Sequence, residues 1–285
     1  MSMFLYLGLP PLAIYALVSR YLLKNPHHLH KRKQPAFYCT HISHRGGSGE
    51  RIESTMEAFT HAVEQGTEML EMDCHLTQDG YVVVSHDENL KRQTGQDVNI
   101  SSLNLEELPL YNESLEVTFH AGHHSTGTDR KIALLEDVFR KFPQIPISIE
   151  IKENNQQLMQ ENSSMPYSFS MKRGVLVLLL FYIGLLPFVP LGESLLQFYL
   201  PRIINRTYIP EKGILRKRLI VSLIDKITMR KSLFKHLAAR GIQVHLFVCN
   251  EHKDIKEAFE LGVTGVMTDY PSLLSSYIQT YRSQH

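Results

Sequence analysis

The chain has 285 residues, and its 30 Lys and Arg residues nearly balance its 29 Asp and Glu residues. That near-neutral charge excludes a generally basic nucleic-acid-binding protein. With 43% apolar residues, the chain can form one large folded domain and does not have the composition of a disordered protein. The widely spaced Cys39, Cys74 and Cys249 exclude a disulfide-rich scaffold and a cysteine zinc site.

An apolar segment opens the chain. Residues 3–23 carry one charge, Arg20, and are long enough for a helix that crosses the hydrocarbon core. A cleaved signal peptide is the alternative, but no charge precedes the segment and no small-residue cleavage site follows it. We therefore predict a transmembrane anchor over 1–24 and a basic linker over 25–38. Basic residues at 31–33 favour the cytosolic side for the rest of the chain.

A second apolar segment, residues 174–191, carries no charge. It could be a buried core helix, but core helices normally keep a polar face, and this segment has none. A full span would place two halves of one domain on opposite sides of the bilayer. We therefore expect a re-entrant or interfacial insertion within a domain covering 39–285. The basic residues of 202–240 suit anionic lipid headgroups, although a solvated helix face also explains them.

The predicted elements of the domain alternate between strand and helix. Apolar periodicity predicts helices over 55–65, 134–142 and 253–261. Alternation of strands with helices is typical of a parallel sheet, and at this length of a TIM-type α/β barrel. Seven strand-like segments are found, over residues 39–43, 68–76, 81–85, 145–151, 166–171, 242–248 and 263–267.

Polar side chains gather where these strands end. Residues two apart on a strand face the same side, and parallel barrels keep catalytic groups at the carboxyl ends of their strands. Acidic and basic groups on one side of several strands are costly unless they are paired or bind a cation. The candidates are His44, Arg45, Glu71, Asp73, His86, Glu150 and Lys152.

These residue types together indicate phosphoryl chemistry. Glu71, Asp73 and Glu150 form a hard oxygen site that favours one divalent cation, Mg²⁺ or Ca²⁺, over zinc. His44 and His86 can supply a general base and a general acid. Each residue alone also has a structural explanation, but a pattern across four strands favours a functional site.

Two further candidates are cationic. Arg45 and Lys152 are placed to bind an anion such as phosphate. Lys152 could instead pair with Glu71 in a purely structural role. A cation site, two histidines and two anion-binding side chains together describe phosphoryl chemistry.

Four motifs carry a resemblance to a known family. HRGGSGERIESTMEAF, EMDCHLTQDGYVVVSHDE, IEIK and GVTGVMTDYP resemble the glycerophosphodiester phosphodiesterases over about residues 39–285. The apolar segments resemble the membrane-anchored lysophospholipase D branch of that family. The resemblance implies a (β/α)₈ barrel. It also implies release of choline or ethanolamine from lysophospholipids, including N-acylethanolamine lysophospholipids, to leave lysophosphatidic acid.

The family pattern also implies roles for the motif residues. It makes His44 and His86 the acid–base pair, and the substrate's own glycerol hydroxyl the nucleophile that forms a cyclic phosphate for water to open. It makes Arg45, Lys152 and Glu53 the phosphate- and substrate-binding residues. It makes Glu71, Asp73 and Glu150 the ligands of the metal ion, and it places His86 close enough to contact the ion.

The chain departs from this pattern in three places. Ser54 replaces the family's Asn after Glu53, and Phe247 stands where the family usually has Trp. After Lys152, only residues 153–165 precede the next strand-like segment, where a helix, a strand and a helix are expected. A missing strand leaves two unpaired edges in a sheet that should close. We therefore predict an incomplete barrel with seven strands.

The sequence thus predicts a membrane-bound, metal-dependent lysophospholipase D. Its expected partners are a lysophospholipid and a lipid bilayer, with no nucleic acid and no obligate protein partner. The expected location is the endoplasmic reticulum or perinuclear membrane, with the catalytic domain facing the cytosol. Sequons at Asn99, Asn112, Asn162 and Asn205 argue weakly for the lumen. The alternatives are a phosphodiesterase for water-soluble glycerophosphodiesters and a catalytically impaired membrane-anchored variant.

Overall fold

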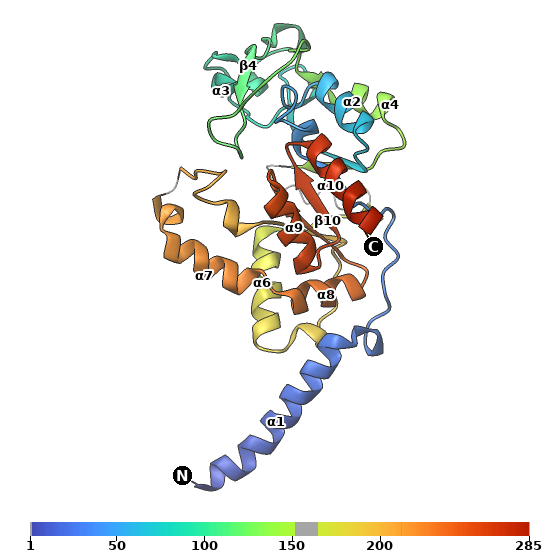
Figure 1. Cartoon of the computed structure of the whole chain (residues 1–285), viewed down its shortest axis with the longest axis vertical. Coiled ribbons are helices and arrows are strands. Elements are labelled where there is room, and N and C mark those ends of the chain that lie inside the picture. Colours follow the sequence, from blue (N-terminus) through green and yellow to red (C-terminus); the bar gives the residue numbers. More distant parts are fainter. Residues whose placement is uncertain (1, 152–164, 212, 285) are drawn as a thin grey trace.

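The computed structural model of the chain describes residues 2–151, 165–211 and 213–284. Within these residues, six strands run parallel in one sheet (Figure 1). In lateral order they are β7 (Ile147–Glu150), β2 (Met69–Leu76), β1 (His41–Ser43), β10 (Gly265–Thr268), β9 (Gln243–Phe247) and β8 (Leu195–Tyr199). Strand β8 was not predicted from the sequence.

Helices pack on this sheet and bury its apolar side chains. The first, α2 (Met56–Glu64), begins at Thr55, whose Oγ1 accepts a hydrogen bond from the Ala58 N–H. Its Phe59 and Ala62 are fully buried against Leu70 of β2. The other helices of the body are α4 (Leu135–Lys141), α8 (Lys231–Ala239), α9 (His252–Leu261) and α10 (Pro271–Gln284). Short 3-10 turns are Pro26–His28, His44–Gly46, Ile100–Ser102, Leu105–Glu107, Leu186–Phe188, Pro201–Ile203 and Gly213–Arg216. The three predicted helices are confirmed.

A cap covers one end of the sheet, at the top of Figure 1. It contains α3 (Lys91–Thr94) and the hairpin of β4 (Ser114–Glu116) and β5 (His124–Thr126). The segment predicted as a barrel strand over 81–85 is instead β3 (Val82–Val84), antiparallel to β2 and to β6 (Ala133–Leu134). The prediction is wrong because Gly80, at a φ of +89°, turns the chain back onto β2.

The parallel sheet is open on one side. Among the described residues, β7 pairs with β2 and with no other strand. Residues 167–169 lie beside β8. Ser168 forms an isolated parallel bridge with Leu195, and the Phe169 N–H donates to the Leu195 carbonyl at 2.9 Å. No described strand joins β7 to this segment. Of the seven predicted strands, 81–85 therefore lies outside the parallel sheet and 166–171 contributes only the bridge at Ser168. Residues 152–164 lie outside the described residues, so the predicted incomplete barrel stays a prediction.

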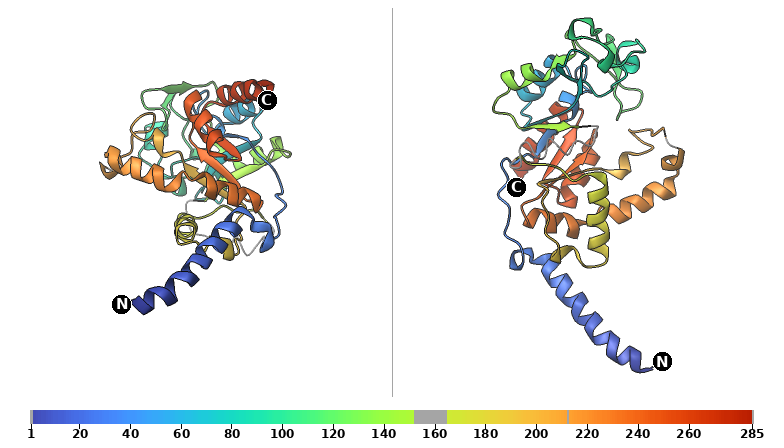
Figure 2. Two further views of the ribbon diagram at one scale, coloured as in Figure 1. Left: turned by 60° about the horizontal axis from the view of Figure 1, so that its bottom comes forward. Right: turned by 180° about the vertical axis from the view of Figure 1, so that it is seen from behind.

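The N-terminal helix α1 (Ser2–Lys24) projects from the body (Figures 1 and 2). Among the described residues, no helix combines the length and the apolar character that crossing a membrane requires. The predicted transmembrane anchor over 1–24 is therefore not supported. The last turns of α1 contact the body of the protein. Ser19 Oγ donates a hydrogen bond to the Gly184 carbonyl at 2.6 Å, and Leu22 is buried.

The second apolar segment, 174–191, is divided between two structures. Its first part lies in α6 (Met171–Tyr182), and a short turn at Leu186–Phe188 follows. Val177 and Leu186 are buried, whereas Leu179 is 57% exposed. The segment is therefore only partly core. A further helix, α7 (Arg218–Thr228), lies beside α6 in both views of Figure 2.

Candidate active site

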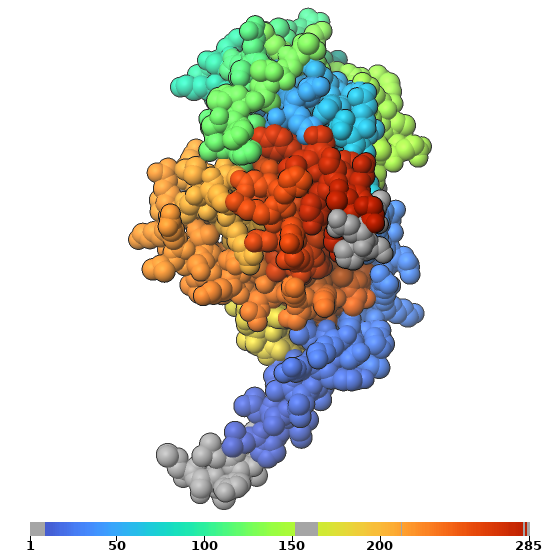
Figure 3. All heavy atoms as spheres, viewed as in Figure 1, coloured from blue at the N-terminus to red at the C-terminus, as the bar shows by residue number. Residues whose placement is uncertain are grey.

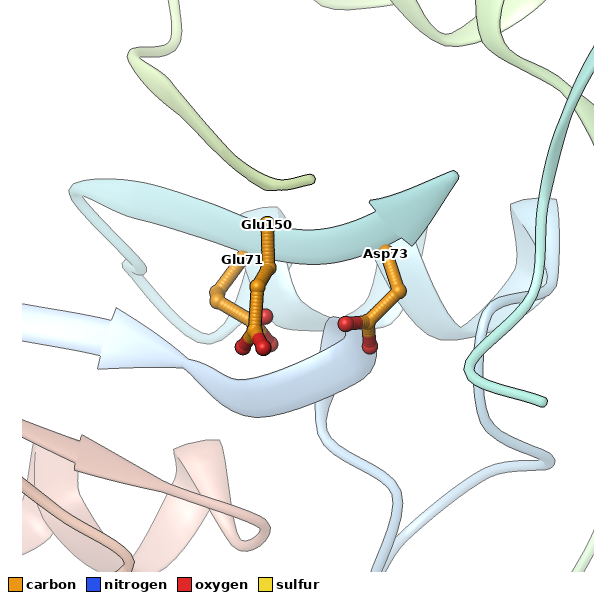
Figure 4. A group of neighbouring side chains, drawn as sticks. All are labelled: Glu71, Asp73 and Glu150. Atoms are coloured by element: carbon orange, nitrogen blue, oxygen red, sulfur yellow. The ribbon is translucent and has the colours of Figure 1, made fainter. Parts of the chain in front are cut away.

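Three carboxylates converge where the carboxyl end of β7 lies beside β2 (Figure 4). Glu71 and Asp73 lie two apart on β2, so both face the same side, and parallel register places Glu150 of β7 opposite Asp73. One oxygen of each lies within 4.8 Å of the others. Glu71 and Asp73 are buried, whereas Glu150 is exposed at the open edge of the sheet.

This carboxylate cluster fits a divalent cation. Two oxygens on opposite sides of Mg²⁺ or Ca²⁺ are about 4–5 Å apart, which is the span found here. Burial and the neighbouring Asp73 raise the pKa of Glu71 to about 7. A bound cation would offset that repulsion, so Glu71, Asp73 and Glu150 suit the metal site expected from the sequence.

Beside the cluster, His44 is held by a carboxylate that the sequence analysis did not single out. His44 Nδ1 lies 2.6 Å from Asp269 Oδ1, at the carboxyl end of β10. A carboxylate only accepts, so Nδ1 carries the hydrogen and Nε2 is the nitrogen able to take a proton. Burial opposes the charged imidazole, but Asp269 outweighs that effect and raises the pKa of His44. Asp269 also accepts from Ser48 Oγ at 2.5 Å and Asn250 Nδ2 at 2.7 Å.

Arg45 lies between this histidine and the carboxylates. Its φ of +50° is left-handed, and this turn directs its N–H to Glu71 Oε2 at 3.0 Å. Its guanidinium Nη1 is 3.3 Å from Glu53 Oε2, and its Nε is 4.0 Å from Asp73 Oδ2. Burial opposes the charge, yet these carboxylates raise the pKa of Arg45 above its ordinary value. A fixed cation at this position suits a phosphate.

Glu53, expected at the substrate, is only 2% exposed. Its Oε1 accepts from Arg92 Nη2 at 2.6 Å and from Gln93 Nε2 at 2.8 Å. Although burial favours the neutral acid, Arg45 and Arg92 lower the pKa of Glu53 to about 2. The structure thus places Glu53 behind Arg45, where it orients the guanidinium.

The second predicted histidine, His86, lies further out. Its side chain is 31% exposed, and Nδ1 lies 2.5 Å from Asp87 Oδ1. Asp87 in turn accepts from Arg92 Nε at 2.6 Å, which joins His86 to the Glu53 network. Among the described residues, the carboxylate cluster does not include His86, so the expected contact between His86 and a metal stays a prediction. Lys152 lies outside the described residues.

Aromatic rings form a wall over His44 that the sequence analysis also missed. Phe119, on the β4–β5 hairpin, meets the His44 ring edge to face at 5.4 Å and stacks on Tyr208 at 4.6 Å. Tyr199, at the end of β8, lies 4.5 Å from Phe247, the residue where a Trp was expected. The hairpin position of Phe119 has no sequence signal. Asp269 does have one, because it follows a predicted strand as the other site residues do.

A parallel α/β sheet with a carboxylate cluster, a paired histidine and a buried arginine at its carboxyl edge is the architecture of a barrel-type phosphodiesterase. Residues 44–179 and 211–273 match the model of the glycerophosphoryl diester phosphodiesterase family. The chain is 43% identical to human lysophospholipase D GDPD3, over 99% of this chain and 98% of that protein. It is 46% identical to human lysophospholipase D GDPD1, over 94% and 95%. The chain belongs to this family of phosphoric diester hydrolases.

Solved structures support the fold. Glycerophosphodiester phosphodiesterases from Agrobacterium tumefaciens and Thermotoga maritima superpose with TM-scores of 0.55 and 0.54, at 15% and 23% identity. The first covers 84% of this chain and 99% of its own, and the second covers 83% and 97%. They confirm the TIM-type barrel class.

The alignment with human GDPD3 is longer than this chain. It extends over 311 positions, whereas this chain has 285 residues. At least 26 positions of the alignment (311 less 285) therefore face no residue of this chain.

Proposed function

We propose that the chain is a metal-dependent lysophospholipase D, which hydrolyses lysoglycerophospholipids, N-acylethanolamine lysophospholipids included, to lysophosphatidic acid and a free headgroup alcohol. The identity to two lysophospholipases D along nearly the whole chain carries this proposal. The site around His44 supplies the chemical groups that such a reaction needs.

In this proposal, Glu71, Asp73 and Glu150 hold one divalent cation, Mg²⁺ or Ca²⁺. The bound cation supplies charge neutralisation for the phosphodiester. Arg45 binds a phosphate oxygen, and Glu53 fixes the direction of its guanidinium. His44, with Asp269 behind Nδ1, takes the proton from the attacking hydroxyl at Nε2. His86, with Asp87 behind its own Nδ1, returns a proton to the leaving alcohol. Lys152 is proposed as a second phosphate-binding cation.

The test compares three substrates with the purified full-length protein. Lysophosphatidylcholine should release choline in the presence of Mg²⁺ or Ca²⁺, whereas diacyl phosphatidylcholine, which lacks the free hydroxyl, should not. Glycerophosphocholine tests the alternative of a water-soluble diester. His44→Ala serves as the control for contaminating activity. Faster turnover of glycerophosphocholine than of the lysolipid would contradict the proposal and identify water-soluble glycerophosphodiesters as the substrate class.

One observation favours a catalytically impaired variant as the second candidate. Glu71 and Asp73 are buried, whereas Glu150, the third expected cation ligand, is exposed. Absence of choline release by the folded full-length protein at saturating Mg²⁺ or Ca²⁺ would support that candidate.

We also propose that the enzyme acts at the endoplasmic reticulum or perinuclear membrane with its site facing the cytosol. A lysolipid substrate and the exposed apolar residues of α1 and α6 support this location. Endoglycosidase treatment of the expressed protein tests the orientation, because a mobility shift that depends on Asn99 and Asn112 would place the site in the lumen.

A further inference from the structure

Exposed apolar side chains lie on both α6 and α7, and a hydrogen bond joins the carboxyl ends of these helices. On α7, Leu219, Leu223 and Ile227 lie four residues apart and are 86%, 57% and 37% exposed. Val221 on the opposite side is buried. One side of this helix is buried against the core, and a second apolar stripe faces solvent. Such an exposed stripe is typical of a surface that binds a partner or a membrane.

α6 extends this stripe. Tyr182 Oη donates to the Ile227 carbonyl at 2.8 Å and ties the end of α6 to the end of α7. We call the exposed apolar side chains of the two helices the apolar platform: Met171, Val175, Leu179 and Tyr182 of α6 with Leu219, Leu223 and Ile227 of α7. In Figure 3 the segment that contains α7, in orange, forms the flank of the molecule.

Basic residues border the apolar platform. Arg216, Lys217 and Arg218 precede or begin α7, and Lys226 lies in its last turn. The neighbouring carboxylate of α7, Asp225, already pairs with Arg202 at 3.0 Å. Apolar side chains with a border of unneutralised Lys and Arg match the interface of a bilayer that contains anionic lipids. A symmetric contact with a second copy of the chain would set two such basic borders against each other, which like-charge repulsion disfavours.

The helix α7 that carries part of the platform also packs on residues near the active site. A cavity of about 280 Å³ lies under α7, lined by Arg202, Ile204, Asn205, Arg218, Val221, Ser222 and Asp225. The backbone of Ile204 pairs with that of Tyr208, whose ring stacks on Phe119, and Phe119 meets the His44 ring edge to face. The segment under α7 therefore leads directly into the aromatic wall over His44.

We propose that the apolar platform docks onto the surface of an anionic bilayer and brings the aromatic wall over His44 to the lipid. Residues on α1 can also contact lipid, because Leu12 and Leu17 are 61% and 69% exposed. Sedimentation with vesicles alone therefore does not identify the platform. The docking does not depend on which diester the site cleaves.

A site-specific reporter tests the docking. The chain contains no Trp, so Leu223→Trp places one fluorophore on α7. Leu76→Trp is the matched control, since Leu76 at the end of β2 is 56% exposed and Leu223 is 57% exposed. With vesicles of phosphatidylcholine and phosphatidylserine, the emission of Leu223→Trp should shift to shorter wavelength and be quenched by brominated acyl chains. Leu76→Trp should show neither change. An unshifted Leu223→Trp on vesicle-bound protein overturns the proposal.

The Leu223→Trp reporter also tests the role of the basic residues beside the platform and the identity of the docking partner. Adding Arg218→Gln and Lys226→Gln to Leu223→Trp should raise the lipid concentration at half-maximal shift by about tenfold or more on anionic vesicles. The same pair should change little on pure phosphatidylcholine. Equal effects on both lipids contradict the charge component. A blue shift that rises with protein concentration without lipid would identify a second copy of the chain as the occupant, and would also overturn the proposal.

Discussion

The hydrogen bond between His44 and Asp269 sets the protonation of the proposed general base. Asp269→Asn removes the carboxylate that raises the pKa of His44, so that pKa falls. We expect turnover to fall by about 10²-fold or more, because an amide no longer holds the required tautomer. The acidic limb of the pH–rate profile should move to lower pH, because a His44 with a lower pKa is already deprotonated, and able to accept a proton, at lower pH.

Ser48→Ala is the control for that change. It removes one donor to Asp269 but keeps the carboxylate against His44. Turnover should fall by less than about tenfold, and the acidic limb should hardly move. An unchanged pH–rate profile in Asp269→Asn would show that Asp269 has a structural role alone.

Glu71 makes the stability of the metal-free protein depend on pH. Its pKa of about 7 lies above the ordinary value of 4.5, so the folded protein holds this proton more tightly than the unfolded chain. The stability that the neutral carboxyl provides is full below about pH 4.5 and is lost as the pH rises through about 7. In Glu71→Gln this component of the melting temperature's pH dependence should disappear.

The same substitution should remove the response to metal. Cation binding needs the ionised carboxylate, so Mg²⁺ or Ca²⁺ should raise the melting temperature more at pH 8 than at pH 6. Glu71→Gln should lose that rise at both values. A variant that keeps the full metal-induced rise would place the cation elsewhere.

Glu53 stabilises the fold through its charge. Its folded pKa of about 2 lies below 4.5, so its contribution is present above about pH 4.5 and is lost as the pH falls toward 2. Glu53→Gln should lower the free energy of unfolding near pH 7 by about 3 kcal/mol, because Arg45 and Arg92 lose their shared carboxylate. Urea denaturation measures this loss. Glu136→Gln, which breaks an exposed pair with Arg140, should cost less than about 1 kcal/mol.

At the scale of the elements, no described strand lies between β7 and residues 167–169. A strand edge without a partner leaves backbone groups without sheet hydrogen bonds. We expect that inserting the human GDPD3 residues that face no residue of this chain raises the melting temperature and tightens cation binding. A graft of equal length made of Gly and Ser is the control. Equal effects of both grafts would show that a missing strand is not the cause.

Sequence patterns predicted the parts of this fold whose signals are local. The alternation of β2 placed Glu71 and Asp73 on one face, and the same positional rule brought Glu150 to them. Periodicity does not distinguish a parallel strand from an antiparallel one, so β3 was assigned to the barrel. Leu195–Tyr199 of β8 is a short apolar segment, and periodicity alone does not assign such a segment to a strand or a helix.

Such local patterns do not predict contacts between residues that lie far apart in the sequence. Asp269 follows His44 by 225 positions, and the two meet only because β1 and β10 pair. The contact of Phe119 with His44 depends on how the cap folds over the sheet. The network around Glu53 likewise appears only when the turn after β1 and the cap come together.

For the whole molecule, the N-terminal helix divides into a projecting part and a docked part. Ser19 and Leu22 pack on the body, and the Leu23 carbonyl lies 2.8 Å from His236 Nδ1. Removing residues 2–14 should therefore leave the free energy of unfolding unchanged within about 0.5 kcal/mol. Removing residues 2–24 should lower it by about 2 kcal/mol or more, because buried polar groups such as His236 lose partners and Leu22 leaves its site.

Urea denaturation of the two truncated proteins, measured beside the full chain, separates these parts. His236→Asn in the full chain is a useful companion, because it weakens the contact to Leu23 without removing α1. It should cost less than removal of 2–24, since Ser19 and Leu22 stay in place. If removal of 2–24 left stability unchanged, the helix would not be docked on the body, and the apolar residues of α1 would face solvent or lipid along its whole length.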